Sequence, residues 1–198
     1  MHRREAILIL SISLLSLLII PLDMEIAEAV FSWRTPIMDT FMVYYTTYGN
    51  YIFALAEGMI LLASKNKKFR YYLYLVLNSY FGWFVADRLV VAIKNIVRRP
   101  RPYVANPAIT ALAPVGGFSF PSGHSSAAWA LATPFIVTTR SRLARFLLIL
   151  FAVLMSFSRV YCGVHFVSDV IFGGCIGYIV SKQIYDNITA EKLMLNKE

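Results

Sequence analysis

Apolar residues in this chain are gathered into long, nearly uninterrupted blocks, and polar residues are concentrated between them. Most blocks reach the roughly 20 residues that a helix needs to cross about 30 Å of hydrocarbon. A segment inside a bilayer must satisfy its own backbone hydrogen bonds, so such blocks predict helices. We therefore predict an all-α, polytopic membrane protein with six transmembrane helices. The predicted spans are about Ala6–Leu22, Phe41–Ala63, Tyr71–Val97, His124–Thr138, Leu143–Tyr161 and Phe166–Ile184.

The composition agrees with a membrane protein and argues against a soluble one. The chain has 198 residues, which suits a single domain over residues 1–198. Apolar residues make up 58% and charged residues only 15%, too little charge for the surface of a soluble domain. The net charge is +8, but the basic stretch Lys65–Arg70 lacks the interleaved aromatics and polar surroundings of a nucleic-acid site. We therefore expect membrane lipids and no nucleic acid as partners; the oligomeric state is left open.

Basic residues in the connecting segments predict the orientation of the chain. Four basic groups, at residues 3–4, 65–70, 140–145 and 182–197, fall on the same side of a six-helix arrangement. By the positive-inside rule that side is the cytoplasm, so both termini are predicted to be cytoplasmic. The segment from Asp23 to about Thr40 then lies on the outer side. The spacing of Ile26, Val30 and Trp33 predicts a short interfacial helix there.

A cluster of basic residues opposes this orientation because it falls at or just inside the outer side: Lys94, Arg98, Arg99, Arg101 and Arg159. Basic residues that break the topology rule need a local reason, and an anionic ligand supplies one. Lys94 and Arg101 are seven residues apart and would share one helix face, with Arg98 between them, before Pro100 and Pro102 end the helix. Guanidinium and ammonium groups bind phosphate oxygens well, although anchoring to lipid headgroups would use the same residues.

A second motif, Phe120-Pro121-Ser122-Gly123-His124, directly precedes the fourth predicted span. Ser122 can donate its hydroxyl proton, Gly123 lets its backbone N–H approach a ligand, and the start of a helix is itself an anion site. His124 at this position can protonate a leaving oxygen. A serine N-cap followed by an incidental histidine is the competing interpretation.

A third motif joins Ser158 and Arg159 to His165 and Asp169 at the start of the sixth predicted span. His165 and Asp169 are four residues apart, so they share a helix face. A carboxylate bonded to one ring nitrogen fixes the tautomer and leaves the other nitrogen free to attack. The alternative is a polar pair that only stabilises the start of the helix.

The predicted topology lets these three motifs meet at one depth, where two histidines, a carboxylate and several cations suit phosphoryl transfer. The motifs read K-x6-R-P over Lys94–Pro102, P-S-G-H over Pro121–His124 and S-R-x5-H-x3-D over Ser158–Asp169. In this order and at these spacings they resemble the signature of the type 2 phosphatidic acid phosphatase superfamily. The motifs lie within residues 94–169, and the six-helix plan extends the resemblance over nearly the whole chain.

The resemblance implies a role for each matching position. His165 would be the nucleophile that becomes phosphorylated, Asp169 would orient it, and His124 would be the general acid for the leaving group. The phosphate oxygens would be held by Lys94, Arg101, Ser122, Gly123 and Arg159. The family uses no metal, and the sequence shows no cluster of carboxylates or Cys/His at metal-ligand spacing, so we expect no metal and no cofactor.

The resemblance therefore implies an integral membrane lipid phosphatase with its active site on the extracytoplasmic face. Its substrate would be a lipid phosphate or polyprenyl diphosphate, such as undecaprenyl diphosphate, phosphatidic acid or phosphatidylglycerophosphate. A phosphotransferase that passes the phosphoryl group from the same histidine to a second lipid shares the first half-reaction. A transporter or non-catalytic lipid-binding protein would not need the complete set of histidines and aspartate.

Several other ionisable residues invite interpretation. Glu57, Asp87 and Arg88 fall within predicted spans, where charged groups are functional suspects. Lys94, Arg98 and Arg101 would form a basic stripe on one helix face. Asp87 lies seven residues before Lys94, so we expect it to neutralise this stripe. Arg98 and its neighbour at position 99 would either extend the cationic rim toward a second phosphate or anchor lipid headgroups.

Overall fold

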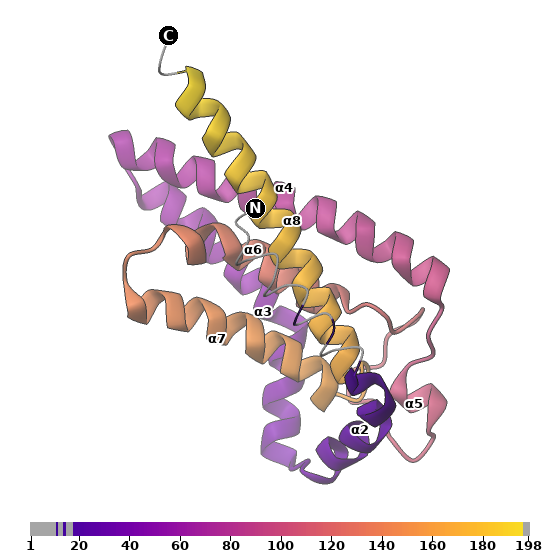
Figure 1. Cartoon of the computed structure of the whole chain (residues 1–198). Helices are drawn as coiled ribbons and strands as arrows, with labels where there is room; N and C mark the ends of the chain where they lie inside the picture. The colour runs from indigo at the N-terminus through magenta and orange to yellow at the C-terminus, as the bar shows by residue number, and fades with distance from the viewer. Residues whose placement is uncertain (1–10, 12–13, 15–17, 196–198) are drawn as a thin grey trace.

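The computed structural model describes residues 11, 14 and 18–195, and every regular element in that part of the chain is helical (Figure 1). The all-α prediction is confirmed. The first predicted span, Ala6–Leu22, lies largely outside the described residues. The elements are η1 (Ile20–Leu22), α2 (Asp23–Ser32), α3 (Pro36–Ala63), α4 (Asn66–Val97), α5 (Pro102–Ala105), α6 (Gly123–Thr138), α7 (Arg142–Tyr161) and α8 (Val167–Leu195).

Local capping chemistry sets where the long helices begin and end. Thr35 caps α3 by accepting a hydrogen bond from the Met38 N–H, and Ser141 caps α7 in the same way. Helix α4 ends at Val97, the last residue of the predicted span and three residues before Pro100. Its last turn is closed by Arg98, which adopts a left-handed conformation (φ 51°) and donates its N–H to the carbonyl of residue 94.

Helix α6 lies at the centre of the bundle, where it contacts α3, α4, α7 and α8 (Figure 1). Small residues on α8 let its backbone come into direct contact with the backbone of α6. A Cβ added at Gly173 would lie 2.3 Å from the carbonyl oxygen of Ser122, and one added at Gly177 would lie 2.1 Å from that of Ser126. These two glycines are four residues apart on α8, the spacing by which helices pack closely in membranes. Only a residue without a side chain fits at either position.

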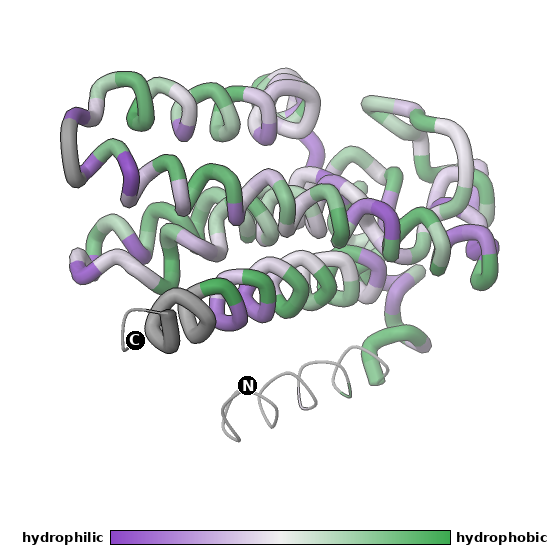
Figure 2. The backbone as a smooth tube through the Cα atoms, turned by 90° about the horizontal axis from the view of Figure 1, so that it is seen from above, coloured by the Kyte–Doolittle hydropathy of each residue, from purple (hydrophilic) through white to green (hydrophobic). Residues whose placement is uncertain are grey.

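Apolar stretches run along the long helices (Figure 2), and many large apolar side chains on α3, α4 and α7 face outward. Such surfaces suit a surrounding of lipid. By length and composition, two helical stretches within the described residues can cross a membrane, Lys68–Ala105 and Arg142–Tyr161. Three features of the topology stay predictions: the count of six transmembrane spans, the cytoplasmic location of both termini, and the interfacial placement of a short helix.

The short helix α2 falls where the sequence predicted one. Ala27 and Val30 are buried, whereas Trp33, which the spacing placed on the same face, is 64% exposed. Helix α2 does not stand apart from the bundle, because Ala27 packs against Phe166 beside α8. The first residue of α2, Asp23, is almost fully buried. This carboxylate lies within the protein and not on the outer surface.

Candidate active site

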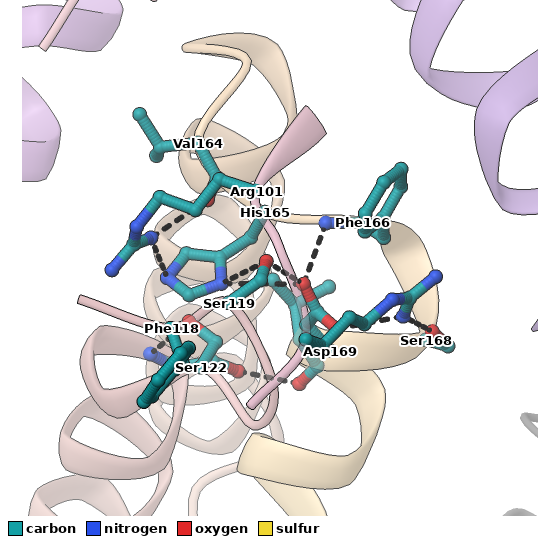
Figure 3. Close-up of polar contacts among 12 residues, drawn as sticks. Arg101, Phe118, Ser119, Ser122, Val164, His165, Phe166, Ser168 and Asp169 are labelled. Carbon is teal, nitrogen blue, oxygen red and sulfur yellow. Dashed lines mark hydrogen bonds and ion pairs between the residues drawn. The ribbon is translucent and has the colours of Figure 1, made fainter. Parts of the chain in front are cut away.

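Three segments that are separate in the sequence meet around His165 and Asp169 (Figure 3). They are the chain that follows α4, the loop before α6 with the first turn of α6, and the α7–α8 connection. The Ser122 N–H donates to the Asp169 carbonyl (2.9 Å), and Arg101 reaches His165 across the same junction. The structure thus brings together the three motifs that the sequence singled out.

His165 is held in a defined tautomer. Its side chain is 3% exposed, its Nδ1 lies 3.4 Å from Oδ2 of Asp169, and its Nε2 lies 3.2 Å from Nη1 of Arg101 (Figure 3). A guanidinium can only donate hydrogen bonds, so Nε2 is the acceptor and the ring proton sits on Nδ1, facing the carboxylate. The free lone pair of the ring therefore lies on Nε2, where it faces Arg101.

The environment of His165 also keeps the ring neutral. The pKa of His165 is lowered to about 3, mainly by burial; the guanidinium groups of Arg159 and Arg101 act in the same direction, whereas the hydrogen bond to Asp169 and the charge of that residue oppose it. The lowering effects prevail, so the imidazole is unprotonated at neutral pH. A protonated ring could not attack phosphorus, so this environment suits a nucleophile.

The Asp169 carboxylate is fully enclosed and bonded on both oxygens. Oδ2 accepts hydrogen bonds from the Phe166 N–H (2.9 Å) and from the Ser119 hydroxyl, and it faces His165. Oδ1 accepts from Nη1 of Arg99 (2.8 Å). The carboxylate therefore cannot rotate away from the ring without breaking several bonds. Sequence reasoning missed Ser119, whose only signal is a position three residues before Ser122.

Lys94 and Arg101 bind the loop that carries Ser119. The Lys94 ammonium donates to the carbonyls of Phe118 (2.7 Å) and Ser119 (3.0 Å). Besides His165, the Arg101 guanidinium donates to the carbonyls of Val164, Gly116 and Gly117. Both cations thus lie beside the segments that contact His165, and they bind uncharged carbonyl oxygens.

The predicted basic stripe on one helix face is wrong in one respect. Helix α4 ends before Arg98, so Arg98 and Arg101 do not continue the face of Lys94. Arg98 is exposed and its side chain donates to the carbonyl of Asn95 on its own helix. Arg101 instead reaches the site from the N-cap of α5, because the prolines redirect the chain there.

Arg159 is buried at the end of α7, with 2% of its surface exposed. Its Nη1 donates to Oγ1 of Thr46 on α3 (2.5 Å), and its Nε has no hydrogen-bond partner among the described residues. A buried guanidinium with an unpaired nitrogen calls for an additional acceptor, and a phosphate oxygen is one. Thr46 gave no sequence signal, because it lies in a run of tyrosines and threonines on a predicted span.

His124 occupies the first turn of α6, after Ser122, whose side chain caps the helix. The ring of His124 makes no hydrogen bond to another described residue, whereas its backbone carbonyl accepts one from the side-chain amide of Asn50 (3.2 Å). Together with Gly123 it lines a cavity of about 540 Å³ between α3, α4 and α6. Apolar side chains such as Leu55 and Trp83 form much of the rest of its wall.

The remaining ionisable residues have partners of their own. Asp87 forms an ion pair with Arg88, so the prediction that it neutralises Lys94 is wrong. Glu57 on α3 accepts hydrogen bonds from the Ser79 hydroxyl on α4 (2.9 and 2.8 Å). Within the described residues, no group of three or more His, Cys, Asp or Glu side chains is arranged to hold a metal ion. Independence from metal stays a prediction.

Comparison with known proteins gives a consistent result. The model of the PAP2 superfamily matches residues 68–191. The chain is 27% identical to undecaprenyl-diphosphatase BcrC of Bacillus subtilis, over 80% of each chain. It is 32% identical to lipid A 4'-phosphatase of Bacteroides thetaiotaomicron, over 53% of this chain and 56% of that protein.

Two solved structures have a similar fold. Aquifex aeolicus LpxE superposes with a TM-score of 0.72 at 25% identity, covering 83% of this chain and 95% of LpxE. A transmembrane PAP2-type phosphatidylglycerolphosphate phosphatase from Bacillus subtilis superposes with a TM-score of 0.68 at 24% identity, over 91% and 94% of the two chains.

Proposed function

We propose that this chain, which belongs to the PAP2 superfamily and is a phosphatase, removes a phosphoryl group from a membrane lipid through a phosphohistidine at His165. The observation that carries the proposal is the state of His165. Its ring is neutral, its proton faces Asp169, and its Nε2 lone pair is directed toward Arg101. A histidine held only for packing would not need both partners.

The proposed reaction has two half-reactions. In the first, Nε2 of His165 attacks phosphorus, the bond from phosphorus to the leaving oxygen breaks, and His124 gives its proton to that oxygen. The positive charge that develops on the His165 ring is balanced by Asp169. In the second, His124 accepts a proton from water, the oxygen of that water attacks phosphorus, and the bond to Nε2 breaks. Inorganic phosphate is released and the free histidine is restored.

The cations stabilise charge on the transferring group. Nη1 of Arg101 lies in front of Nε2 in the free protein, so we propose that it turns to a phosphate oxygen when the substrate enters. Arg159 brings a nitrogen that has no acceptor among the described residues, and Lys94 adds a third positive charge. Ser122 and the backbone of Gly123 complete the donors at the start of α6.

The proposed substrate is a lipid phosphate or polyprenyl diphosphate, such as undecaprenyl diphosphate, phosphatidic acid or phosphatidylglycerophosphate. Two similarities support this class, because the relatives are named for undecaprenyl diphosphate and for lipid A. The cavity beside His124 also supports it, since its largely apolar wall suits a hydrocarbon chain close to the proposed acid. With a diphosphate, the leaving group would be the lipid monophosphate.

The test is phosphate release by the purified protein in detergent, with undecaprenyl diphosphate, phosphatidic acid and phosphatidylglycerophosphate supplied one at a time. We expect release of inorganic phosphate from at least one lipid with no second lipid present, which distinguishes hydrolysis from phosphotransfer. EDTA should leave the rate unchanged and vanadate should inhibit. Loss of activity on chelation that a divalent ion restores would contradict the mechanism.

We further propose a cell-membrane location with the active site on the extracytoplasmic side, supported by the distribution of basic residues. In a protein whose two native cysteines are replaced by serine, a membrane-impermeant thiol reagent should label a cysteine at position 108 in intact cells. It should label a cysteine at position 66 only after the cells are opened. The reverse pattern would place the site in the cytoplasm.

A further inference from the structure

A second layer of charged residues lies behind the Asp169 carboxylate, on the side away from His165. Its centre is Arg99, whose Nη1 donates to Oδ1 of Asp169 (2.8 Å) and to Oγ of Ser168 (2.7 Å). Nη2 of the same guanidinium donates to Oδ2 of Asp23 (2.8 Å). One arginine therefore bridges two carboxylates that lie 146 positions apart in the sequence.

Asp23 is the first residue of α2, and its side chain is 2% exposed. Besides Arg99, it accepts the N–H of Ser168 on Oδ1 (3.0 Å) and the hydroxyl of Ser168 on Oδ2. Its two oxygens thus bind both the guanidinium and the first turn of α8. A buried carboxylate is costly unless it is paired and hydrogen-bonded, and this one is bonded on both oxygens.

Arg99 is held in place from a third direction. The carbon of its guanidinium lies 4.0 Å from the centre of the Phe166 ring, and only 20% of its side chain is exposed. These contacts exclude the role at a cationic rim that the sequence allowed, because the two terminal nitrogens already serve Asp169, Ser168 and Asp23. The planar fork of arginine suits this bridge, since it presents separate N–H groups to two carboxylates.

We propose that Asp23 and Arg99 are positioning residues for catalysis, which fix Asp169 so that its other oxygen stays directed at Nδ1 of His165. This inference rests on the proposed function, in which the His165–Asp169 pair carries the chemistry. Without Asp23, Arg99 loses its second anchor and can swing toward solvent. Asp169 would then lose its Oδ1 partner, and only the hydrogen bonds to Oδ2 would still resist its rotation.

The experiment measures phosphohistidine formation by rapid acid quench of the full-length protein in detergent, with a ³²P-labelled lipid from the panel above. The variants are Asp23→Asn and Arg99→Lys, which conserve size or charge but disrupt the bridge. We expect the rate constant of the burst to fall about tenfold in each, the lower end of the roughly 10–100-fold loss that follows when the outer partner of an oriented, metal-bound histidine is replaced. KM should change little, because neither residue faces the phosphate.

The amplitude of the burst separates positioning from folding. If the bridge only stabilised the fold, the variants would contain less active protein, so the amplitude would fall while the rate constant stayed at the wild-type value. The double variant should be no slower than either single variant, because both substitutions break one bridge. Additive losses would contradict the proposal.

Glu28→Gln is the matched control, since Glu28 also lies on α2 and accepts a hydrogen bond, from Asn106, but has no contact with the bridge. It should leave the rate constant unchanged. Asp169→Asn distinguishes failure of the positioning role from failure of the proposed function. If Asp169→Asn is slow and Asp23→Asn reacts at the wild-type rate, only the positioning role fails. If Asp169→Asn itself reacts at the wild-type rate, the proposed function fails.

Discussion

The two histidines of the candidate site have opposite surroundings. His165 is enclosed by protein, and both of its ring nitrogens face named partners, Asp169 on one side and Arg101 on the other. The ring of His124 has no hydrogen-bond partner among the described residues, and it lines a cavity of about 540 Å³. One half of the site is therefore assembled before a substrate arrives, and the other half is open.

This difference matches what each half would have to do. A nucleophile meets the same phosphorus atom in every substrate, so a fixed geometry costs it nothing and raises the rate of attack. A general acid meets leaving groups of different size, and it becomes aligned only when one of them fills the space beside it. The enclosed half would thus determine the attack on phosphorus, and the open half would determine which substrates are accepted.

The largest expected effect is on the enclosed side. His165→Ala should abolish turnover and phosphohistidine formation together, because no other histidine in the described part of the chain contacts both Asp169 and Arg101. The measurement is acid-quench trapping of label from a ³²P-labelled substrate. Retention of label in this variant, with loss of label in His124→Ala, would show that the two roles are assigned in reverse.

A smaller and more selective loss is expected on the open side. His124→Ala should lower the rate on a lipid monophosphate by about 10²–10⁴-fold, the usual value of general acid catalysis. The loss on p-nitrophenyl phosphate should be far smaller, because that leaving group needs little protonation. A lipid diphosphate should fall between the two. Equal losses on all three substrates would argue against a role for His124 as the acid.

Narrowing the cavity should have a milder effect still. Leu55→Trp places an indole at its wall and should raise KM for lipid substrates several-fold, while KM for p-nitrophenyl phosphate, which has no hydrocarbon chain, should not change. Leu62→Trp is the control, because Leu62 is 83% exposed on the same helix and does not line the cavity. An equal change in KM in both variants would show that the cavity does not bind the lipid chain.

The smallest expected change is in the protonation of His165 over the physiological range. Because burial lowers its pKa to about 3, the ring should remain the neutral Nδ1–H tautomer from about pH 8 down to about pH 5. Nitrogen NMR of the histidine-labelled protein in detergent measures this, with His165→Ala to assign the signal. A midpoint of titration between these values would mean that the ring is less enclosed than the structure indicates.

The sequence was a good guide to the helices because long apolar blocks, prolines and capping residues act locally. The predicted span Leu143–Tyr161 differs from α7 by one residue, and His124–Thr138 differs from α6 by one. The stripe through Arg98 failed for a local reason as well, since the helix stops just before it and a left-handed residue turns the chain. A residue count along an ideal helix does not contain that turn.

The motif residues could be found from sequence because their types are rare in apolar segments, but their partners could not. Thr46, Ser119 and Asp23 are ordinary residues whose importance depends on which helix end lies opposite them. That arrangement is a property of the packed bundle and not of any local pattern. Asp87 shows the converse, because a suggestive spacing from Lys94 was overruled by the adjacent Arg88.

The close approach of α8 to α6 has a consequence for genetics. His124 lies in the first turn of α6 and His165 just before α8, and the space between the two helices at Gly173 and Gly177 is too small for even a methyl group. Alanine at either position must push apart the segments that hold His124 and His165, without altering any reacting group. In a map of variant effects, both glycines should therefore be as intolerant as the histidines, and such a map alone would mistake two spacing constraints for chemistry.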